Sequence, residues 1–267
     1  MGKKPINQKE KKMLKFSVCI EALYNKFPFV ERIDKVAAVG MKYFEFWGWG
    51  GKDIDAIKAS KDKHGLEVAI FGADAGGPIV DPANRVKIAD GMKKSAAVAH
   101  KLGCKRLILT TGNEIEGVSR ADQHRSIVDG LKVAARVMED EGIILCLEPL
   151  NILVNHKGYY LATSDEAFEI VDEVGSPNIK IPYDIYHQQI TEGNLIDTIN
   201  ANIDKIGHFH FADVPGRHEP GTGEINYKNV FKSISETNYQ AFLGTEYWPI
   251  GSDDESLKYI LEMTKDM

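Results

Sequence analysis

Short runs of β-branched and aromatic residues alternate along the chain with longer segments whose apolar residues recur at helical spacing. A short apolar run between turn residues predicts a buried strand, whereas apolar residues three and four positions apart predict an amphipathic helix. Eight strand–helix alternations can be counted in this way. The predicted strands are Lys15 to Ile20, Tyr43 to Trp47, Val68 to Gly72, Arg106 to Thr110, Ile143 to Glu148, Ile179 to Asp184, Ile206 to Phe211 and Phe242 to Glu246.

Helix ends are indicated by capping residues. After the first predicted strand, an apolar stripe that begins at Phe29 is followed by Gly40, at a place where a left-handed residue commonly ends a helix. Thr163 and Glu166 have the spacing of an N-terminal capping box. The glycines that we interpret as further helix terminators are Gly65, Gly103, Gly142, Gly175 and Gly207.

Strands that alternate with helices pair in parallel, and eight such units in 267 residues predict one closed (β/α)8 TIM barrel of the α/β class. No GxGxxG motif follows the first predicted strand, which disfavours an open dinucleotide-binding sheet. We expect the barrel domain to span residues 14–267, after a flexible basic N-terminal arm over residues 1–13. A cytoplasmic location is the default expectation, with a removed leader peptide as the open alternative.

The composition is that of a globular protein, with 43% hydrophobic and 27% charged residues. A formal net charge of −6 disfavours nucleic acid as a partner, and no stretch approaches the roughly 20 apolar residues of a membrane span. The partner that we expect is a small-molecule substrate, and a homo-oligomer stays open. Three cysteines without metal-binding spacing, Cys19, Cys104 and Cys146, are expected to be reduced core residues.

Charged or metal-binding residues stand at the ends of the last four predicted strands. Because the C-terminal strand ends of a TIM barrel form its functional face, we expect these residues to converge. One such carboxylate alone is more often an ion-pair partner, but four residues on consecutive strands favour a site for Mn²⁺, Mg²⁺ or Co²⁺, which bind hard oxygens and imidazole. The expected metal ligands are Glu148, Asp184, His210 and Glu246.

The pair Glu148 and Glu246 also suggests a reaction. A divalent ion chelated by a hydroxyl and its neighbouring carbonyl stabilises the enediolate that forms when a carbon-bound proton is removed. An aldose–ketose isomerisation needs that intermediate, a base to take the proton and an acid to return it. We therefore expect Glu148 and Glu246 to be the catalytic acid/base pair, with neutralisation of the metal charge as the simpler alternative.

Two side chains after the sixth and seventh predicted strands are candidates for substrate binding. Arg217 lies in a loop rich in glycine and proline, and its guanidinium fits a substrate carboxylate or a pair of hydroxyls. The alternative is a surface ion pair of Arg217 with Glu219 or Glu224. His187 could donate to a substrate carbonyl oxygen, although a single histidine is more often structural.

The second predicted strand, in the segment YFEFWGWGG, places Glu45 among aromatic residues. A buried charge is costly without a partner, so we expect Glu45 to face the barrel mouth or a cation. The aromatic residues are typical of a core, but Trp47 and Trp49 could also line a small substrate pocket. Glu45 and Trp47 are therefore candidate substrate-binding residues.

The motifs LEPLN, YDIYHQQ, GHFHFADVPGRHEPGTGEINY and GTEYWP together resemble the hydroxypyruvate isomerase family, within the xylose isomerase-like TIM barrel superfamily. The resemblance extends from about Phe16 to the end of the chain. It implies an intramolecular oxidoreductase that interconverts hydroxypyruvate and tartronate semialdehyde. It also implies the same site residues: Glu148 and Glu246 as the catalytic pair, Asp184 and position 210 as further metal ligands, and His187 and Arg217 as substrate contacts.

Position 210 departs from this family, because hydroxypyruvate isomerases usually carry Gln there, whereas related ketose 3-epimerases such as tagatose or psicose epimerase carry His. Those epimerases also have a Glu where this chain has Val154. The substrate therefore stays open between a short hydroxy-keto acid and a ketose. Less favoured alternatives are an endonuclease IV-like DNA repair enzyme, which needs a basic surface, and a non-catalytic sugar-binding barrel.

Overall fold

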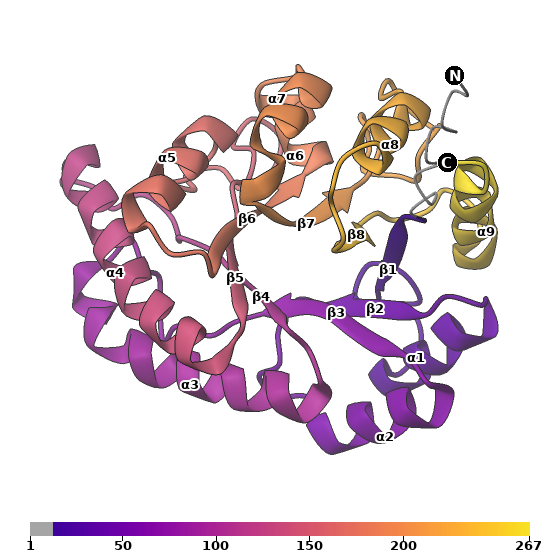
Figure 1. Ribbon diagram of the computed structural model, residues 1–267, viewed down its shortest axis with the longest axis horizontal. Helices are drawn as coiled ribbons and strands as arrows, with labels where there is room; N and C mark the ends of the chain where they lie inside the picture. Colours follow the sequence, from indigo (N-terminus) through magenta and orange to yellow (C-terminus); the bar gives the residue numbers. More distant parts are fainter. Residues whose placement is uncertain (1–12) are drawn as a thin grey trace, which may run out of the picture.

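Eight parallel strands form a closed barrel in the computed structural model, which describes residues 13–267 (Figure 1). Each strand pairs with the next along the chain, and β8 closes the barrel against β1. The predicted (β/α)8 TIM barrel is therefore confirmed, and every predicted strand is correct to within one residue at each end. The strands are β1 (Lys15–Cys19), β2 (Tyr43–Phe46), β3 (Glu67–Gly72), β4 (Arg106–Leu109), β5 (Ile144–Leu147), β6 (Ile179–Asp184), β7 (Ile206–Phe211) and β8 (Phe242–Thr245).

At least one helix follows each strand and packs on the outside of the barrel (Figure 1). Two helices, α6 and α7, lie between β6 and β7, and short 3₁₀ turns precede α3 and β7. The helices are α1 (Phe29–Ala38), α2 (Ile54–His64), α3 (Arg85–Leu102), α4 (Arg120–Glu141), α5 (Ser164–Val174), α6 (Ile185–Thr191), α7 (Leu195–Asn202), α8 (Tyr227–Ser235) and α9 (Asp253–Thr264).

The caps of these helices follow the sequence signals, with one exception. The Thr163 side chain accepts from the Glu166 amide at the start of α5, and the helices that precede Gly65, Gly103, Gly142 and Gly175 end at those residues in the left-handed conformation. The interpretation of Gly207 as a terminator is wrong, because Gly207 lies inside β7. A Cβ there would lie 2.6 Å from Cys146 Sγ, so close packing between strands explains this glycine.

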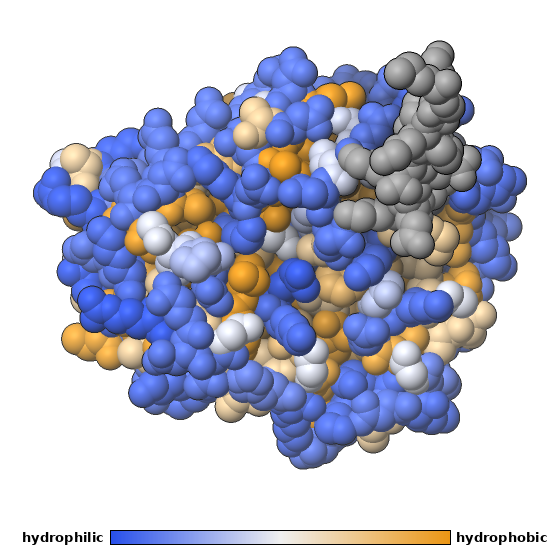
Figure 2. Space-filling view, in the orientation of Figure 1, coloured by the Kyte–Doolittle hydropathy of each residue, from blue (hydrophilic) through white to orange (hydrophobic). Residues whose placement is uncertain are grey.

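The barrel interior and the layer between strands and helices form one hydrophobic core. The strand residues are almost all buried, as expected for a parallel sheet that is covered on both faces. All three cysteines are buried and free, which confirms their assignment as reduced core residues. On the face drawn in Figure 2, hydrophilic residues cover most of the surface, and hydrophobic residues show between them.

The predicted N-terminal arm lies outside the described residues, apart from the exposed Met13. The division into an arm and a barrel domain therefore stays a prediction. Within residues 13–267, no helix is long and apolar enough to cross a membrane.

Candidate active site

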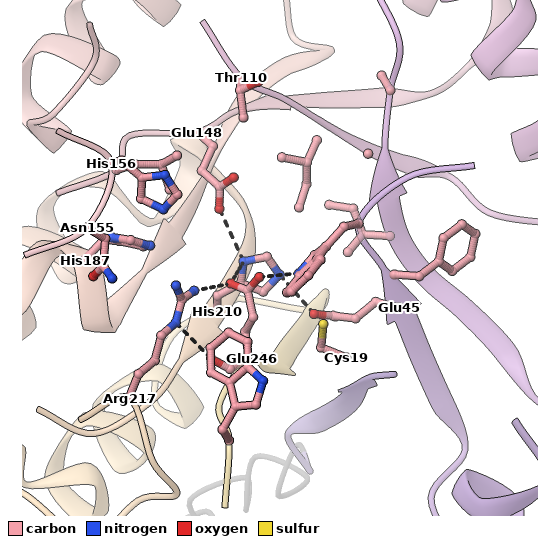
Figure 3. Close-up of a pocket in the computed structure, with 18 residues that line it drawn as sticks. Cys19, Glu45, Thr110, Glu148, Asn155, His156, His187, His210, Arg217 and Glu246 are labelled. Atoms are coloured by element: carbon pink, nitrogen blue, oxygen red, sulfur yellow. Dashed lines mark hydrogen bonds and ion pairs between the residues drawn. The ribbon is translucent and has the colours of Figure 1, made fainter. Parts of the chain in front are cut away.

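Four side chains from the ends of β5 to β8 meet at the C-terminal mouth of the barrel. Each is buried and offers one ligand atom, and these atoms all lie within 4.8 Å of one another. Figure 3 shows two of the carboxylates directed toward the imidazole at the centre of the group. The structure thus brings together the residues that the sequence analysis selected. We call them the ligand cluster: Glu148, Asp184, His210 and Glu246.

Local contacts hold the carboxylates of the ligand cluster in place. Asp184 is the N-cap of α6, and its Oδ1 accepts from the Tyr186 and His187 amides at 2.8 and 3.2 Å. Its other oxygen, Oδ2, is therefore the one that faces the other members of the ligand cluster. Glu246 accepts from Trp47 Nε1 at 2.6 Å and, through its other oxygen, from Arg217 Nη2 at 2.7 Å.

The ligand cluster concentrates negative charge in a buried space. Burial raises the pKa of Glu148, and the charges of Glu246 and Asp184 raise it further, against the lowering effect of His210. Burial alone would lower the pKa of His210, but the negative charges of Glu246 and Glu45 hold this pKa well above its ordinary value. Three carboxylates around one imidazole therefore favour the binding of a further positive charge.

The residues of the ligand cluster fit a hard divalent cation. Three carboxylates and one imidazole are donors typical of Mn²⁺, Mg²⁺ or Co²⁺ sites. His210 Nδ1 is buried and has no hydrogen-bond partner in the described part of the chain, although it lies 3.4 Å from Glu148 Oε1 and 3.3 Å from Glu246 Oε2. A buried nitrogen that faces two carboxylates is well placed to hold a proton or, once that proton is lost, a metal cation.

Arg217 lies over the ligand cluster, in the loop after β7. Its Nη2 contacts Glu246 at 2.7 Å and Asp184 at 3.4 Å, and the guanidinium stacks on the rings of Tyr186 and Trp248. The alternative of a surface ion pair with Glu219 or Glu224 is therefore wrong. The backbone of Arg217 has a φ of 59°, a conformation that non-glycine residues adopt rarely and often at functional sites.

Asp213 organises the loop that carries Arg217, a role that the sequence analysis missed. Its buried carboxylate accepts from the amides of Val214, Gly221 and Ile225 at 2.8–3.0 Å. The Arg217 amide in turn donates to the Asp213 carbonyl at 3.1 Å. An Asp followed by a loop rich in glycine and proline is a signal for such side-chain-to-backbone bonds.

His187, at the start of α6, lines the pocket, and its Nε2 lies 3.6 Å from Asp184 Oδ2. Its Nδ1 accepts from the Asn151 amide at 3.1 Å, whereas its buried Nε2 has no hydrogen-bond partner within residues 13–267. Burial and the nearby Arg217 charge lower the pKa of His187 well below its ordinary value. A neutral ring that accepts at Nδ1 carries its proton on Nε2, so His187 is a hydrogen-bond donor toward the pocket.

The two candidates on the second strand segment differ in position. Trp47 is half exposed at the pocket rim, where it donates to Glu246. Glu45 is 2% exposed and lies on the opposite side of His210 from Glu148 and Glu246 (Figure 3). Burial raises the pKa of Glu45, but the charges of His208 and His210 outweigh it and lower this pKa to about 2. Glu45 therefore faces the His210 imidazole, whose pKa is raised well above its ordinary value, and it also lines the pocket at the barrel mouth.

A cavity of about 540 Å³ opens beside the ligand cluster. Its polar side contains Glu148, His210, Glu246, His187 and Arg217, and its other side is formed mainly by uncharged residues of β1 to β4. The lining residues that the sequence analysis did not select for a site are Cys19, Phe46, Ile70, Gly72, Ala73, Ile108, Thr110, Leu150, Asn155, His156 and Trp248.

Known proteins resemble this chain over nearly its whole length. A family model described as "Xylose isomerase-like TIM barrel" matches residues 33–267. The chain is 34% identical to a hydroxypyruvate isomerase of Escherichia coli (strain K12), over 93% of this chain and 98% of that protein. It is 30% identical to a 2-oxo-tetronate isomerase of Haemophilus influenzae, over 90% of this chain and 95% of that protein.

Two solved structures illustrate the shared fold. An AP endonuclease, family 2, from Brucella melitensis superposes with a TM-score of 0.89 and 28% identity, covering 94% of this chain and 99% of that one. A 3-keto-D-glucoside 4-epimerase from E. coli superposes with a TM-score of 0.80 and 23% identity, covering 93% and 99%. At the lower identity, the likeness shows the fold alone.

Proposed function

Because the chain belongs to the xylose isomerase-like TIM barrel family, we propose that it is an isomerase that acts on a short hydroxy-keto acid. The substrate would be hydroxypyruvate, which the name of the E. coli relative contains, and the product would be tartronate semialdehyde, as the family resemblance implies. The observation that carries the proposal is the ligand cluster, in which two glutamates face the same buried nitrogen beside an open cavity.

The ligand cluster would hold Mn²⁺, Mg²⁺ or Co²⁺. A divalent ion there would supply positive charge to the substrate oxygens on which negative charge develops during the reaction. Asp184 and His210 serve only as ligands in this proposal. Glu148 and Glu246 are ligands that also face the substrate.

Proton transfer is the task of Glu148 and Glu246. One carboxylate removes the proton from the hydroxyl-bearing carbon, and the resulting enediolate accepts a proton at the neighbouring carbon from the other. The hydroxyl proton passes to the neighbouring carbonyl oxygen in the same conversion, so that one proton moves between the two carbons and one between the two oxygens, and no oxidant or reductant is consumed. His187 donates from Nε2 to a substrate oxygen, and Arg217 binds a substrate carboxylate or hydroxyl while it orients Glu246.

A ketose 3-epimerase is the second candidate, for two specific reasons. His210 supplies the nitrogen that the resemblance associates with epimerases, and the cavity of about 540 Å³ has more room than a three-carbon acid requires. Against it, Val154 stands at the position of the additional epimerase glutamate. This side chain is 68% exposed and does not line the cavity.

Deuterium exchange tests the proposed function. Metal-stripped protein is reloaded with Mn²⁺ and incubated in D₂O with hydroxypyruvate, 2-oxo-tetronate, fructose, tagatose or psicose. We expect a hydroxy-keto acid to be isomerised with deuterium bound to carbon in the product. Glu148→Gln and Glu246→Gln should abolish this exchange.

The alternatives give different results in the same assay. Turnover of neutral ketoses only would contradict the keto-acid assignment and favour the epimerase. A product that contains no solvent deuterium but keeps the label of a C-deuterated substrate, formed with a primary isotope effect, would indicate hydride transfer instead.

A further inference from the structure

A second buried group lies directly behind the ligand cluster. Glu45, on β2, reaches across the barrel to two histidines on β7, and the three residues are each at most 3% exposed. Glu45 Oε1 lies 2.9 Å from His210 Nε2, and Glu45 Oε2 lies 3.1 Å from His208 Nε2. Both histidines point inward because they are two residues apart on one strand. Glu45 therefore contacts the edge of His210 that faces away from the ligand cluster.

The fold leaves a specific space for this carboxylate. Gly244, on β8, pairs in register with His210, and a Cβ at Gly244 would lie only 2.2 Å from Glu45 Oε1. Any side chain at position 244 would displace Glu45. On the other side, Ser17 Oγ donates to Glu45 Oε2. β1, β7 and β8 thus all contribute to a pocket that fits the Glu45 carboxylate beside the His210 ring.

The two nitrogens of His210 face two different groups. Nδ1 lies between Glu148 and Glu246, and Nε2 faces Glu45. Histidines that bind metals usually contact a carboxylate or carbonyl through their second nitrogen, which fixes the orientation of the ring and its tautomer. We propose that Glu45 is a positioning residue of the metal site, which holds the Nε2 edge of His210 so that Nδ1 points into the ligand cluster. This inference rests on the proposed metal site but not on the identity of the substrate.

The same three residues have a composition that could bind a second cation. Two features favour the positioning role instead. Glu45 Oε2 already accepts from Ser17, and the space next to Glu45 Oε1 is bounded by Gly244. The metal stoichiometry distinguishes the two assignments, because the positioning role requires one ion per chain.

Metal binding tests the role of Glu45 separately from catalysis. Metal-stripped parent, Glu45→Gln and Ser17→Ala proteins are titrated with Mn²⁺ by calorimetry. We expect one ion per chain in the parent and about 10- to 100-fold weaker binding in Glu45→Gln, the range usual for the loss of such a supporting contact. Ser17→Ala is the matched control, because it removes a different contact to Glu45 and should weaken binding by less than about threefold.

A spectroscopic measurement separates positioning from a simple effect of charge. Electron spin-echo modulation of bound Mn²⁺ should show an imidazole ¹⁴N coupling in the parent and in Ser17→Ala, and a weakened or lost coupling in Glu45→Gln. A lower affinity with an unchanged ¹⁴N coupling would mean that Glu45 acts through its charge alone, and would overturn the proposal. Unchanged affinity, or a second ion that disappears in Glu45→Gln, would overturn it as well.

The parent protein alone provides a test that does not depend on the folding of a variant. In Mg²⁺-loaded protein with ¹⁵N-labelled histidine, the His210 signals should show a proton on Nε2 and none on Nδ1. A proton on Nδ1 would contradict the proposal. If the parent binds no divalent ion at all, the proposed metal site itself is wrong. If the parent and Glu45→Gln bind the ion equally well, the metal site stands and only the positioning role of Glu45 is wrong.

Discussion

The two halves of the barrel mouth differ in the side chains that they direct into the cavity. The ends of β5 to β8 carry the ligand cluster and are followed by His187 and Arg217, so that this half presents ionisable side chains. The ends of β1 to β4 contribute mainly uncharged residues, among them Phe46, Ile70 and Ile108. The reacting groups are therefore concentrated in one half of a nearly symmetric fold, and the other half forms a wall that sets the shape of the cavity.

Glu45 is a charged residue in the otherwise uncharged half, and its contacts connect the two halves. It is a carboxylate on β2, in the uncharged half, but it contacts His210 and His208 on β7. Trp47, which follows β2, likewise donates to Glu246 after β8. The uncharged half thus supports the ligand cluster from behind and from the rim, by contacts that cross the barrel.

The largest effect is expected when a ligand in the charged half is lost. Asp184→Asn should weaken Mn²⁺ binding and lower kcat/KM for hydroxypyruvate by more than about 100-fold, because a neutral amide no longer balances the metal charge. The fold should survive, since Asn is also a good N-cap for α6. Calorimetry and steady-state kinetics measure both quantities. Asp172→Asn, on the exposed face of α5, is the control, and parent-like Mn²⁺ affinity in Asp184→Asn would refute the ligand assignment.

Removal of Arg217 should have the second largest effect. Arg217→Ala should lower kcat/KM for hydroxypyruvate by about 10- to 100-fold, the cost of one charge-assisted contact, and Arg217→Lys should recover only part of this loss. The same variants are assayed with neutral ketoses if the parent turns these over. A loss of equal size for acids and ketoses would show that Arg217 acts by orienting Glu246 rather than by binding a carboxylate.

The sequence was sufficient to predict the barrel because its strands are buried on both faces and stand out as short apolar runs. Gly207 was misinterpreted, since the contact that requires a glycine in β7 comes from Cys146 on β5, a strand that does not pair with β7. The ligand cluster could be selected because the C-terminal ends of consecutive parallel strands meet at one edge.

Contacts that cross the barrel were beyond sequence reasoning. The two histidine partners of Glu45 lie more than 160 positions away along the chain, and they become its neighbours only when the barrel closes. The ion pairs of Arg217 depend on the left-handed backbone conformation of Arg217 itself and on a loop that the Asp213 carboxylate organises. Such geometry leaves no periodic signal in the sequence.

The smallest effect is expected in the uncharged wall, and it tests whether this half takes part in the reaction. Ile70, on β3, lines the cavity and is 1% exposed. Ile70→Val should lower the free energy of unfolding by about 0.5–1.5 kcal/mol, because a buried methylene group is lost. Since hydroxypyruvate is too small to fill the cavity while it contacts the ligand cluster, its kcat/KM should change by less than about threefold.

Ile57→Val, in the buried face of α2 away from the cavity, should lower the free energy of unfolding by a similar amount and is the matched control. Denaturant unfolding and steady-state kinetics of both variants decide the question. A tenfold loss of kcat/KM in Ile70→Val but not in Ile57→Val would mean that the wall contacts the reacting substrate, and the division between a reacting half and a shaping half would not hold.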